Sequence, residues 1–308
     1  MRLILKRMMN LPSNPVLRKL GYSDHDRLVI IHTDDIGMCE ASVSAFDALW
    51  AAGTISSGSV MTPCPWFAHA AAWCRIHPDV DMGVHITLTS EWTAYRWGPI
   101  SSRDPATGML DDEGEFPRAS QPVQEKGDPT AVAREMAAQV QRAIAAGMRP
   151  THIDTHMGTV MHPRFLGDYL QLGQRFGVPV MMPRLSEDEM RHHGLSAEDA
   201  AIQARTLASL EAAGIPLVDQ VVGMPLDMNS DHFEYAKRAF DQLPAGVTHF
   251  LLHPSTDTPE LRALAPDWRG RVENLHTFLR DDLRDTIRSI GVHVIGYRAL
   301  QELMPQNA

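Results

Sequence analysis

The feature that most constrains the fold of this 308-residue chain is a repeated alternation of short apolar, β-branched runs with longer segments of helical pattern. The runs that predict strands are 28–32, 56–61, 82–88, 151–156, 178–182, 217–222, 248–253 and 292–297. The segments that predict helices are 39–52, 65–76, 130–147, 162–176, 197–213, 230–242 and 271–290, with a last one from about 298. Because parallel strands need helical crossovers, this repetition implies a parallel sheet with helices outside it. Eight repeats predict a (β/α)8-type (TIM-like) barrel, regular or distorted, with an open doubly wound sheet as the alternative.

Glycines mark many of the boundaries between these predicted elements. Gly53, Gly147, Gly177 and Gly214 each follow a helical segment, where glycine suits the left-handed residue that ends many helices. No change of composition and no linker divides the chain, so the sequence predicts a single domain over residues 1–308.

One insertion interrupts the repeat after the third predicted strand. Residues 89–129 separate that strand from its helix, and they contain Trp92, Tyr95, Trp97 and several glycines. A connection of this length inside a compact domain is usually a functional lid or a disordered segment. The three aromatic side chains either pack within a lid or offer stacking surfaces to sugar rings, and the sequence favours neither interpretation.

Charge and composition exclude some classes of partner. The chain has 28 basic and 38 acidic residues, which give a net charge of −10, and 44% of its residues are hydrophobic. The hydrophobic share is sufficient for a substantial core. A nucleic acid or an anionic membrane surface needs a cationic face on the protein, so the sequence argues against both partners.

The cysteines and the first residues bear on location and assembly. Cys39, Cys64 and Cys74 are an odd number at spacings that define no disulfide framework, which predicts a reducing cytoplasm. The first twelve residues are basic and apolar, but Lys6 and Arg7 interrupt them, so we expect neither a signal peptide nor a membrane span. The 17 methionines permit a homo-oligomer, in the simplest case a dimer, without requiring one.

Chemically useful side chains occur where the predicted strands end. In parallel α/β folds the reacting groups gather at the carboxyl ends of the strands. Asp34 and Asp35 follow the first strand, His85 lies in the third, and His253 ends the seventh. These residues are therefore expected at one end of the barrel.

The fourth predicted strand adds a further set in the segment THIDTH. His152, Asp154 and His156 alternate along it, so all three point to one face. His156 is nearest the carboxyl end and is the better metal ligand, whereas Asp154 and His152 are predicted to orient it from behind. One aspartate and two imidazoles from separate strands leave room for water, which is the usual design of a catalytic divalent site.

A bound cation would also explain the adjacent carboxylates. If Asp35 coordinates it, the repulsion between the two side chains is offset and Asp34 stays ionised as a base. Each residue also has a purely structural interpretation. The pair can be a helix N-cap with a solvated neighbour, His85 can be a hydrogen-bonded core residue, and His253 can shape a turn.

Together these motifs resemble those of the YdjC-like carbohydrate deacetylases, a family that includes chitooligosaccharide deacetylases and hopanoid-associated deacetylases. The matching segments are HTDDIG (32–37), GSVMTPCPW (58–66), GVHITLTSEW (83–92), PTHIDTHMG (150–158) and LLHPS (251–255). They occur in the order typical of the family, and the resemblance covers roughly residues 15–300.

This resemblance implies a distorted (β/α) barrel and a hydrolase that removes an N-acetyl group from an amino sugar or a sugar-containing small molecule. It implies that Asp35, His85 and His156 bind a divalent metal, either Zn²⁺ or Mg²⁺. It also implies that Asp34 is the base and that His253 is the general acid.

The chain departs from the family pattern at two places. Many members have a small polar residue or alanine before the two aspartates, where this chain has His32 and Thr33. Many also have a further histidine after the T-H-x-D-x-H segment, where this chain has residues 157–160, MGTV. The implied metal ligands are unaffected, but the substrate pocket is expected to differ from that of a chitooligosaccharide deacetylase.

Two other kinds of function could use the same residues. The metal ligands could serve hydrolysis of a phosphodiester or of another amide, or the isomerisation of a sugar. Phosphate chemistry usually needs an Arg or Lys clamp or a second metal, and the only candidates for such a clamp are Arg96 and Arg184. A non-catalytic carbohydrate-binding barrel would use the histidines for hydrogen bonds alone, and it would have no need for the two adjacent aspartates.

Overall fold

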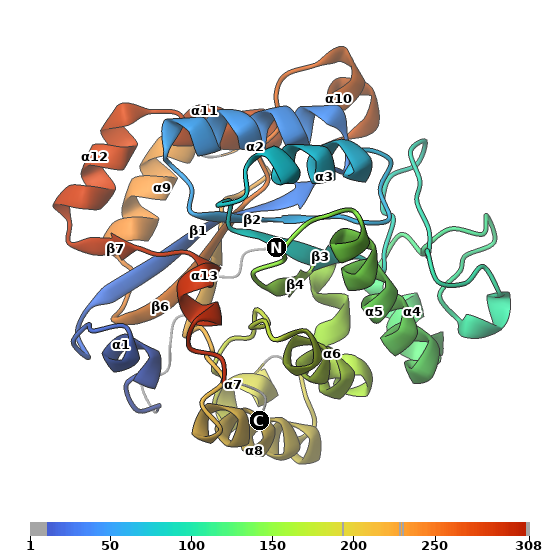
Figure 1. Ribbon diagram of the computed structural model, residues 1–308, viewed down its shortest axis with the longest axis horizontal. Coiled ribbons are helices and arrows are strands. Elements are labelled where there is room, and N and C mark those ends of the chain that lie inside the picture. The colour runs from blue at the N-terminus through green and yellow to red at the C-terminus, as the bar shows by residue number, and fades with distance from the viewer. Residues whose placement is uncertain (1–10, 193, 228, 230, 306–308) are drawn as a thin grey trace.

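The structure, a computed structural model, describes residues 11–192, 194–227, 229 and 231–305 (Figure 1). Within these residues the chain forms one parallel sheet of seven strands. The strands are β1 (Arg27–Ile36), β2 (Ser57–Val60), β3 (Met82–Ile86), β4 (Ile153–Thr155), β5 (Gln220–Gly223), β6 (Gly246–Leu252) and β7 (Val292–Val294). Helices surround the sheet, so the predicted α/β class is confirmed.

The order of the strands indicates a barrel-like sheet. The order is β4–β3–β2–β1–β6–β5, and β7 pairs with β1. β7 pairs with the first residues of β1, Arg27–Val29, whereas β2 pairs with β1 from His32 onward. From β1 to β4 the strands follow chain order, and the chain then returns through β5 and β6 to the other side of β1. This order follows a circle, as in a barrel. A doubly wound sheet would instead reverse its strand order at a switch point.

The predicted strand at 178–182 is present only as isolated bridges, so the prediction of eight complete strands was wrong. Val180 bridges to β4, and Pro183 bridges to Val218, which lies just before β5. Pro179 and Pro183 lack the backbone N–H that a continuous ladder requires, which accounts for the missing strand. The sheet is therefore a parallel half-barrel whose gap is spanned by single bridges.

Most predicted helices are confirmed to within a few residues. The α-helices are α1 (Pro15–Lys19), α2 (Glu40–Ala52), α3 (Phe67–Ile76), α4 (Ser120–Lys126), α5 (Pro129–Ala145), α6 (Pro163–Phe176), α7 (Glu187–His192), α8 (Ala197–Ala212), α9 (His232–Asp241), α10 (Pro259–Leu264), α11 (Trp268–Phe278), α12 (Asp281–Ser289) and α13 (Tyr297–Gln301). The four glycines predicted to end helices all have positive φ, between 65° and 88°. The predicted helix 271–290 is two helices, because Arg280 is extended with ψ of 128°. In the described part of the chain, no helix is both long enough and apolar enough to cross a membrane.

β1 alternates between two apolar clusters. Leu28 and Ile30 pack in a cluster with Tyr297 of α13. Val29 and Ile31 belong to the larger cluster, which the surrounding helices share. Because strand side chains alternate, one face of β1 is turned to the interior of the sheet and the other to the helices.

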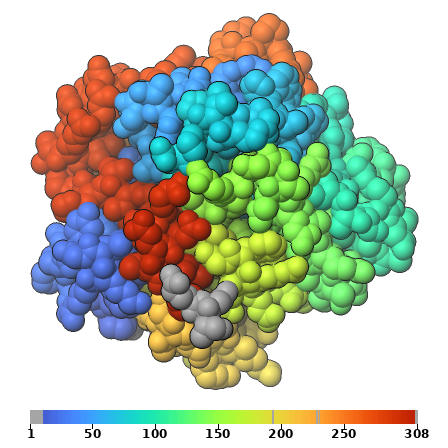
Figure 2. Space-filling model, in the orientation of Figure 1, coloured from blue at the N-terminus to red at the C-terminus, as the bar shows by residue number. Residues whose placement is uncertain are grey.

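The carboxy-terminal segment lies against the amino-terminal end of the sheet. After β7 the backbone N–H of Arg298 donates to Asp81, which directly precedes β3. In Figure 2 this segment (red) occupies the middle of the visible face, between α1 (blue) and the yellow-green chain after residue 150. Segments from both ends of the sequence therefore meet over the first residues of the strands.

Residues 89–129 fold as an ordered excursion at the side of the sheet (Figure 1). They contain a 3-10 turn, η1 (Pro105–Thr107), and α4. Trp92, Trp97 and Phe116 of this segment are buried. The segment therefore has its own apolar packing, and its opening as a lid stays a prediction.

Candidate metal centre

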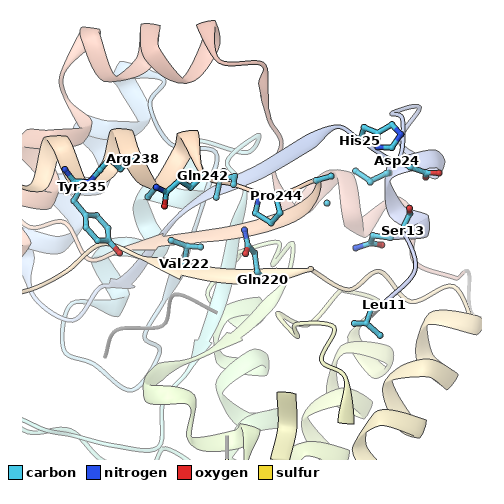
Figure 3. Close-up of a pocket in the computed structure, with 16 residues that line it drawn as sticks. Leu11, Ser13, Asp24, His25, Gln220, Val222, Tyr235, Arg238, Gln242 and Pro244 are labelled. Atoms are coloured by element: carbon cyan, nitrogen blue, oxygen red, sulfur yellow. The ribbon is translucent and has the colours of Figure 1, made fainter. Parts of the chain in front are cut away.

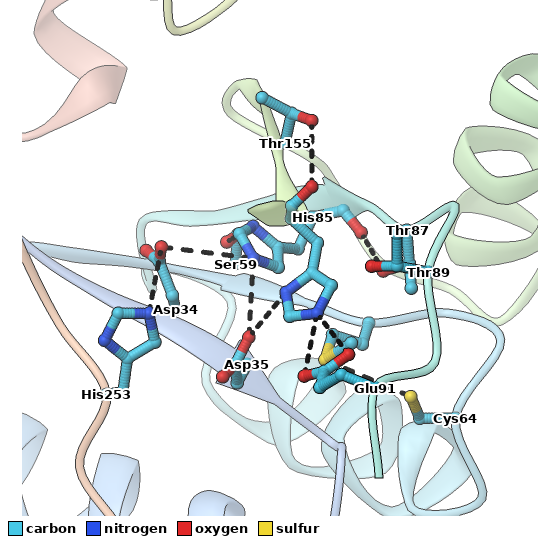
Figure 4. A network of polar contacts seen from close by, with 12 residues as sticks. Asp34, Asp35, Ser59, Cys64, His85, Thr87, Thr89, Glu91, Thr155 and His253 are labelled. Carbon is cyan, nitrogen blue, oxygen red and sulfur yellow. Dashed lines mark hydrogen bonds and ion pairs between the residues drawn. The ribbon is translucent and has the colours of Figure 1, made fainter. Parts of the chain in front are cut away.

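The adjacent aspartates of β1 face the same space because the backbone changes conformation between them. In a regular strand, neighbouring side chains point to opposite faces. Asp35 instead has a left-handed φ of 63°, and the pairing of β1 with β2 shifts register between Thr33 and Ile36. As a result, His85 Nε2 lies 3.9 Å from Asp34 Oδ2 and 3.4 Å from Asp35 Oδ1 (Figure 4). Backbone strain of this kind is typical of functional positions.

Asp35, His85 and His156 bring three ligand atoms to one point. Asp35 Oδ1 lies 3.1 Å from His156 Nδ1 and 3.4 Å from His85 Nε2. The three side chains are buried, and their ligand atoms all lie within 4.8 Å of one another. A tetrahedral ion with ligands at about 2.1 Å holds neighbouring ligand atoms about 3.4 Å apart, so this spacing suits one small cation.

The bonding of Asp35 Oδ1 tests whether a cation fits these residues. This oxygen is buried and forms no hydrogen bond within the described residues, although two imidazole nitrogens lie close to it. A buried acceptor without a donor is costly, and a cation between the three side chains would satisfy it. One carboxylate and two imidazoles form a donor set that suits Zn²⁺, and a carboxylate also suits Mg²⁺. The residues therefore fit a divalent cation.

Asp154 orients His85, and this corrects the predicted pairing of Asp154 with His156. Asp154 Oδ1 lies 2.9 Å from His85 Nδ1, and Asp154 Oδ2 accepts a hydrogen bond from Ser59 Oγ at 2.8 Å. His85 and Asp154 lie directly opposite each other in the pairing of β3 with β4. The contact leaves His85 Nε2 to face Asp35.

Glu91 takes the place behind His156, and the sequence analysis missed it. Both carboxylate oxygens of Glu91 lie 3.1 Å from His156 Nε2. His156 begins the irregular turn η2 (His156–Met161), in which Met157 and Gly158 have positive φ. The sequence does contain a signal for this role, because Glu91 is a carboxylate five residues after β3, at the carboxyl end of the sheet.

Arg271 was also missed, because α11 is remote from β1 in sequence. Its Nη1 donates to Asp35 Oδ2 at 2.8 Å and its Nε donates to Asp267 Oδ1 at 3.0 Å. The guanidinium is buried and lies over the ring of Trp92, 5.5 Å from its centroid. Arg271 therefore holds the oxygen of Asp35 that faces away from the two histidines.

The arginines that the sequence suggested lie elsewhere. Arg96 donates to Asp111 and Glu113 within the 89–129 segment. Arg184 donates to Asp219 and Glu211. Neither side chain contacts the candidate centre through these bonds.

Asp34 lies beside the three ligands, between two histidines. Its Oδ1 is 2.8 Å from His32 Nδ1, and its Oδ2 is 3.7 Å from His253 Nε2 (Figure 4). His253 follows β6 directly, its backbone N–H is bound by Asn274, and its Nδ1 has no hydrogen-bond partner within the described residues. The structure thus brings the predicted base and the predicted acid to the same place.

His152 lies behind this centre rather than next to His156. Its ring stacks on Tyr297 with centroids 3.9 Å apart, and its Nε2 is 2.9 Å from His32 Nε2. Together with His249, which bonds the Tyr297 hydroxyl at 2.8 Å, these rings form a buried polar cluster. A second group of buried side chains has the composition of a metal site, but hydrogen bonds already hold its members, which are His32, Asp34, Asp154 and His249.

The aromatic side chains of the 89–129 segment pack against one another. Trp92, Tyr95 and Trp97 form a triangle with ring centroids 5.9–6.1 Å apart. The Trp97 indole donates to Thr89 O, and the Tyr95 hydroxyl donates to Met38 O. Trp92 and Trp97 are buried, so the structure shows the packing role, and sugar stacking stays a prediction for half-buried Tyr95.

The electrostatic surroundings favour protonated imidazoles. Although burial disfavours the charged form, neighbouring carboxylates, Asp154 above all, raise the pKa of His85 well above its usual value. Glu91 and Asp35 likewise overcome burial and raise the pKa of His156 to about 9. A cation that binds both imidazoles near neutral pH must therefore displace their protons.

The same surroundings keep both aspartates ionised. Burial acts to raise the pKa of Asp35, but His156 and Arg271 hold it well below its ordinary range. For Asp34, burial is again outweighed, and His85 and the hydrogen bond from His32 lower the pKa. A ligand and a base are both available in the charged form at neutral pH.

A cavity lies at the opposite end of the sheet. It has a volume of about 1060 Å³ and is lined by residues that include Asn14, Gln220, Tyr235 and Gly246 (Figure 3). Gly246 pairs with Arg27 at the start of β1, so this cavity lies at the amino ends of the strands. Because reacting groups of parallel α/β folds gather at the carboxyl ends, the cavity is separate from the candidate centre.

Comparisons with known proteins agree with this arrangement. The family model described as YdjC-like protein matches residues 28–289. A carbohydrate deacetylase of Thermus thermophilus is 28% identical over 289 residues, which are 94% of this chain and 99% of the relative. A carbohydrate deacetylase of Brevibacillus brevis is 30% identical over 168 residues, which are 54% of this chain and 64% of the relative.

A solved structure shows the same fold. It is a protein of Enterococcus faecalis described as a candidate cellobiose-phosphate cleavage protein, and it is 22% identical to this chain. The two structures align with a TM-score of 0.74 over 89% of this chain and 99% of that one.

Proposed function

The chain belongs to the YdjC-like protein family, and from that premise we propose that it is a metal-dependent hydrolase that removes an N-acetyl group from an amino sugar or a sugar-containing small molecule. Relatives named carbohydrate deacetylase support the reaction class. The observation that carries the proposal is the convergence of Asp35, His85 and His156, with Asp34 beside them.

Three residues would hold the cation, and two more would orient them. Asp35, His85 and His156 are the ligands, with Zn²⁺ favoured by ligand type and Mg²⁺ as the alternative. A bound divalent cation lowers the pKa of water and polarises a carbonyl oxygen. Asp154 and Glu91 bind the outer nitrogens of the two histidines and so fix the orientation of the rings.

Asp34 is the base in this proposal. His32 holds its Oδ1, while its Oδ2 faces the centre, 3.9 Å from His85 Nε2. Because its lowered pKa keeps Asp34 ionised, it can accept the proton of the water that attacks the acetyl carbon.

His253 then carries that proton to the departing nitrogen. Burial lowers the pKa of His253, so the ring is neutral before the reaction. Its Nε2 lies 3.7 Å from Asp34 Oδ2, and a proton taken up by Asp34 therefore has a neutral acceptor next to it. As the C–N bond breaks, the amine leaves with this proton, and the acetyl carbon keeps the new bond to oxygen.

The arginines favour amide hydrolysis over phosphoryl chemistry. Phosphoryl transfer usually requires free Arg or Lys side chains, or a second metal, around the phosphate. Arg271 is the arginine that reaches Asp35, and both Asp35 and Asp267 already engage it. Arg96 and Arg184 bind carboxylates outside the centre.

The proposal is tested by the product that the purified protein releases. Full-length protein would be treated with a chelator, reloaded with Zn²⁺ or Mg²⁺, and incubated with N-acetylated mono- and disaccharides and with phosphodiesters. We expect acetate release that depends on the added metal and is lost in Asp35→Asn. Phosphate-ester cleavage, or no acetate release with any metal and any N-acetylated sugar, would refute the proposal.

A further inference from the structure

A chain of buried polar side chains runs from Asp34 through the interior of the sheet to its amino-terminal end. Asp34 Oδ1 lies 2.8 Å from His32 Nδ1, and His32 Nε2 lies 2.9 Å from His152 Nε2. His152 Nδ1 lies 3.0 Å from Thr151 Oγ1, which lies 2.5 Å from Asp81 Oδ1. All five residues are buried, and Asp81 directly precedes β3.

The number of available hydrogen atoms restricts how this chain can be bonded. Two imidazole nitrogens at 2.9 Å need one hydrogen between them, because two lone pairs would repel each other. Thr151 has one hydroxyl hydrogen, so it donates either to Asp81 or to His152.

Each choice at Thr151 fixes the protonation of His32. If Thr151 donates to Asp81, a neutral His152 must donate from Nδ1 and accept at Nε2, and His32 is then protonated on both nitrogens. If Asp81 is itself protonated and donates to Thr151, the later bonds reverse. Thr151 then donates to His152 Nδ1, and His152 Nε2 donates to His32 Nε2. His32 then keeps only the hydrogen that it donates to Asp34.

We infer that this chain holds one shared proton that moves between Asp81 and His32, and that His32 is a positioning residue for Asp34. In the shift, the proton of Asp81 passes to Thr151 Oγ1, the hydroxyl proton passes to His152 Nδ1, and the proton on His152 Nε2 passes to His32 Nε2. No proton enters or leaves the chain. The role of Asp34 as base rests on the proposed function, whereas the bonding of His32 does not.

A carboxylate faces each ring nitrogen of His32. The titratable groups that face the ring are Asp34, Asp154, His152, His249 and Tyr297. Asp34 Oδ1 lies 2.8 Å from His32 Nδ1, and Asp154 Oδ2 lies 3.5 Å from His32 Nε2. Burial lowers the pKa of His249 to about 3 and that of His152 well below its usual value, so these neighbours stay neutral.

Asp81 is surrounded by donors that stabilise its carboxylate. Ser57 Oγ and Thr151 Oγ1 donate to its Oδ1, and the backbone N–H of Arg298 donates to its Oδ2 at 2.7 Å. Burial raises the pKa of Asp81, and these three hydrogen bonds oppose the rise. With Thr151 donating to Asp81, the hydrogen count of the chain leaves the shared proton at its other end, on His32 beside Asp34.

The bonding is tested by nitrogen NMR on the full-length protein labelled with ¹⁵N-histidine, with His32 assigned from a His32→Gln variant. In the wild type we expect both ring nitrogens of His32 to be protonated near neutral pH. Thr151→Val keeps the shape of the side chain but removes the link to Asp81. In that variant we expect His152 to carry its hydrogen on Nε2 and His32 to lose its second proton.

Two further variants make this test specific. Ser57→Ala also removes a hydroxyl donor from Asp81 Oδ1, but it leaves Thr151 and the backbone N–H of Arg298 bound to that carboxylate and every link of the chain in place, so we expect the wild-type pattern. Thr151→Ser keeps the hydroxyl and should restore the wild-type pattern. A singly protonated His32 in the wild type, unchanged in Thr151→Val, would overturn the inference. An equal change in Ser57→Ala and Thr151→Val would also overturn it.

The positioning role has its own measurement. In acetate release, Thr151→Val should lower kcat about 10–100-fold with KM and metal content unchanged, while Thr151→Ser and Ser57→Ala stay near the wild type. An unchanged kcat in Thr151→Val would overturn the positioning role. If the wild type released no acetate from any sugar, the proposed function would fail, and the NMR comparison would still decide the bonding.

Discussion

Asp34 and Asp35 are neighbours in sequence, but different groups hold them. Asp34 is bound by His32 and faces His253, whereas Asp35 is bound by Arg271 and faces the two histidine ligands. Adjacent residues of a strand face one space only because Asp35 adopts a left-handed conformation. This separation allows one carboxylate to act as ligand and the other as base.

Asp34→Asn should therefore separate catalysis from metal binding. The amide cannot accept a proton, so we expect kcat to fall ~10²–10⁴-fold while the zinc content of the purified protein stays at the wild-type level. Asp35→Asn, one position further on, is the matched comparison and should lose metal and activity together. Zinc content by elemental analysis and acetate release check both variants. Normal turnover in zinc-loaded Asp34→Asn would exclude Asp34 as the base.

His156 makes the stability of the metal-free protein depend on pH. Its pKa is raised from 6.5 to about 9 by Glu91 and Asp35 against the effect of burial, so its charged form stabilises the fold. This contribution is fully present below pH 6.5 and is lost as the pH rises through about 9. We expect the free energy of unfolding to fall by on the order of 3 kcal/mol across this window. Urea unfolding of chelator-treated protein at several pH values measures it, and a flat or rising profile would contradict the prediction.

At the scale of elements, the 89–129 segment is joined to the end of β4 through Glu91 and His156. Glu91→Gln removes the carboxylate that orients the ring of His156, so we expect zinc affinity to fall about 10–100-fold. Competition with a fluorescent chelator measures the affinity. Glu113→Gln, in the same segment but exposed and paired with Arg96 and Arg118, is the control and should bind zinc normally. Equal affinities in Glu91→Gln and the wild type would show that the contact does not support the ligand.

β3 carries a glycine where its backbone approaches the ring of His152. A Cβ at Gly83 would lie 2.5 Å from Cε1 and Nε2 of that ring, so Gly83→Ala must displace His152. We expect a loss of about 1–3 kcal/mol in the free energy of unfolding, together with lower kcat. Gly167→Ala in α6 is the control, because no atom lies within 4 Å of the added Cβ and alanine favours a helix. Thermal unfolding of both variants checks this, and a fully stable Gly83→Ala would contradict the close packing.

At the scale of the whole molecule, the centre joins parts of the chain that are far apart in sequence. Asp35 belongs to β1. It is contacted by His85 of β3, by His156 of the turn after β4, and by Arg271 of α11. A cation held by Asp35, His85 and His156 would join three of these parts, so it should stabilise the folded chain as a unit.

Zinc should accordingly raise the temperature of unfolding. At a free zinc concentration ~100 times the dissociation constant, binding contributes about 2.7 kcal/mol, which corresponds to a rise of roughly 4 °C for a chain of this size. Differential scanning calorimetry with and without zinc measures the shift. Asp35→Asn should show almost none, and an equal shift in that variant would place the zinc elsewhere.

The sequence by itself determined the α/β class, most element positions and the residues at the strand ends. It could do so because these depend on local periodicity, on glycine at helix ends, and on the rule that strand ends carry the reacting groups. The helix predicted at 271–290 and the strand predicted at 178–182 were wrong, because an extended Arg280 and two prolines interrupt otherwise suitable patterns.

The tertiary structure alone decided which partners these residues have. Asp154 contacts His85 because β3 and β4 pair in that register, and Glu91 contacts His156 at the point where β4 gives way to an irregular turn. Arg271 meets Asp35 across a sequence separation of 236 residues, and no local pattern encodes such a contact. Spacing along the chain fixes which face a side chain occupies, but only the packed sheet fixes what lies opposite it.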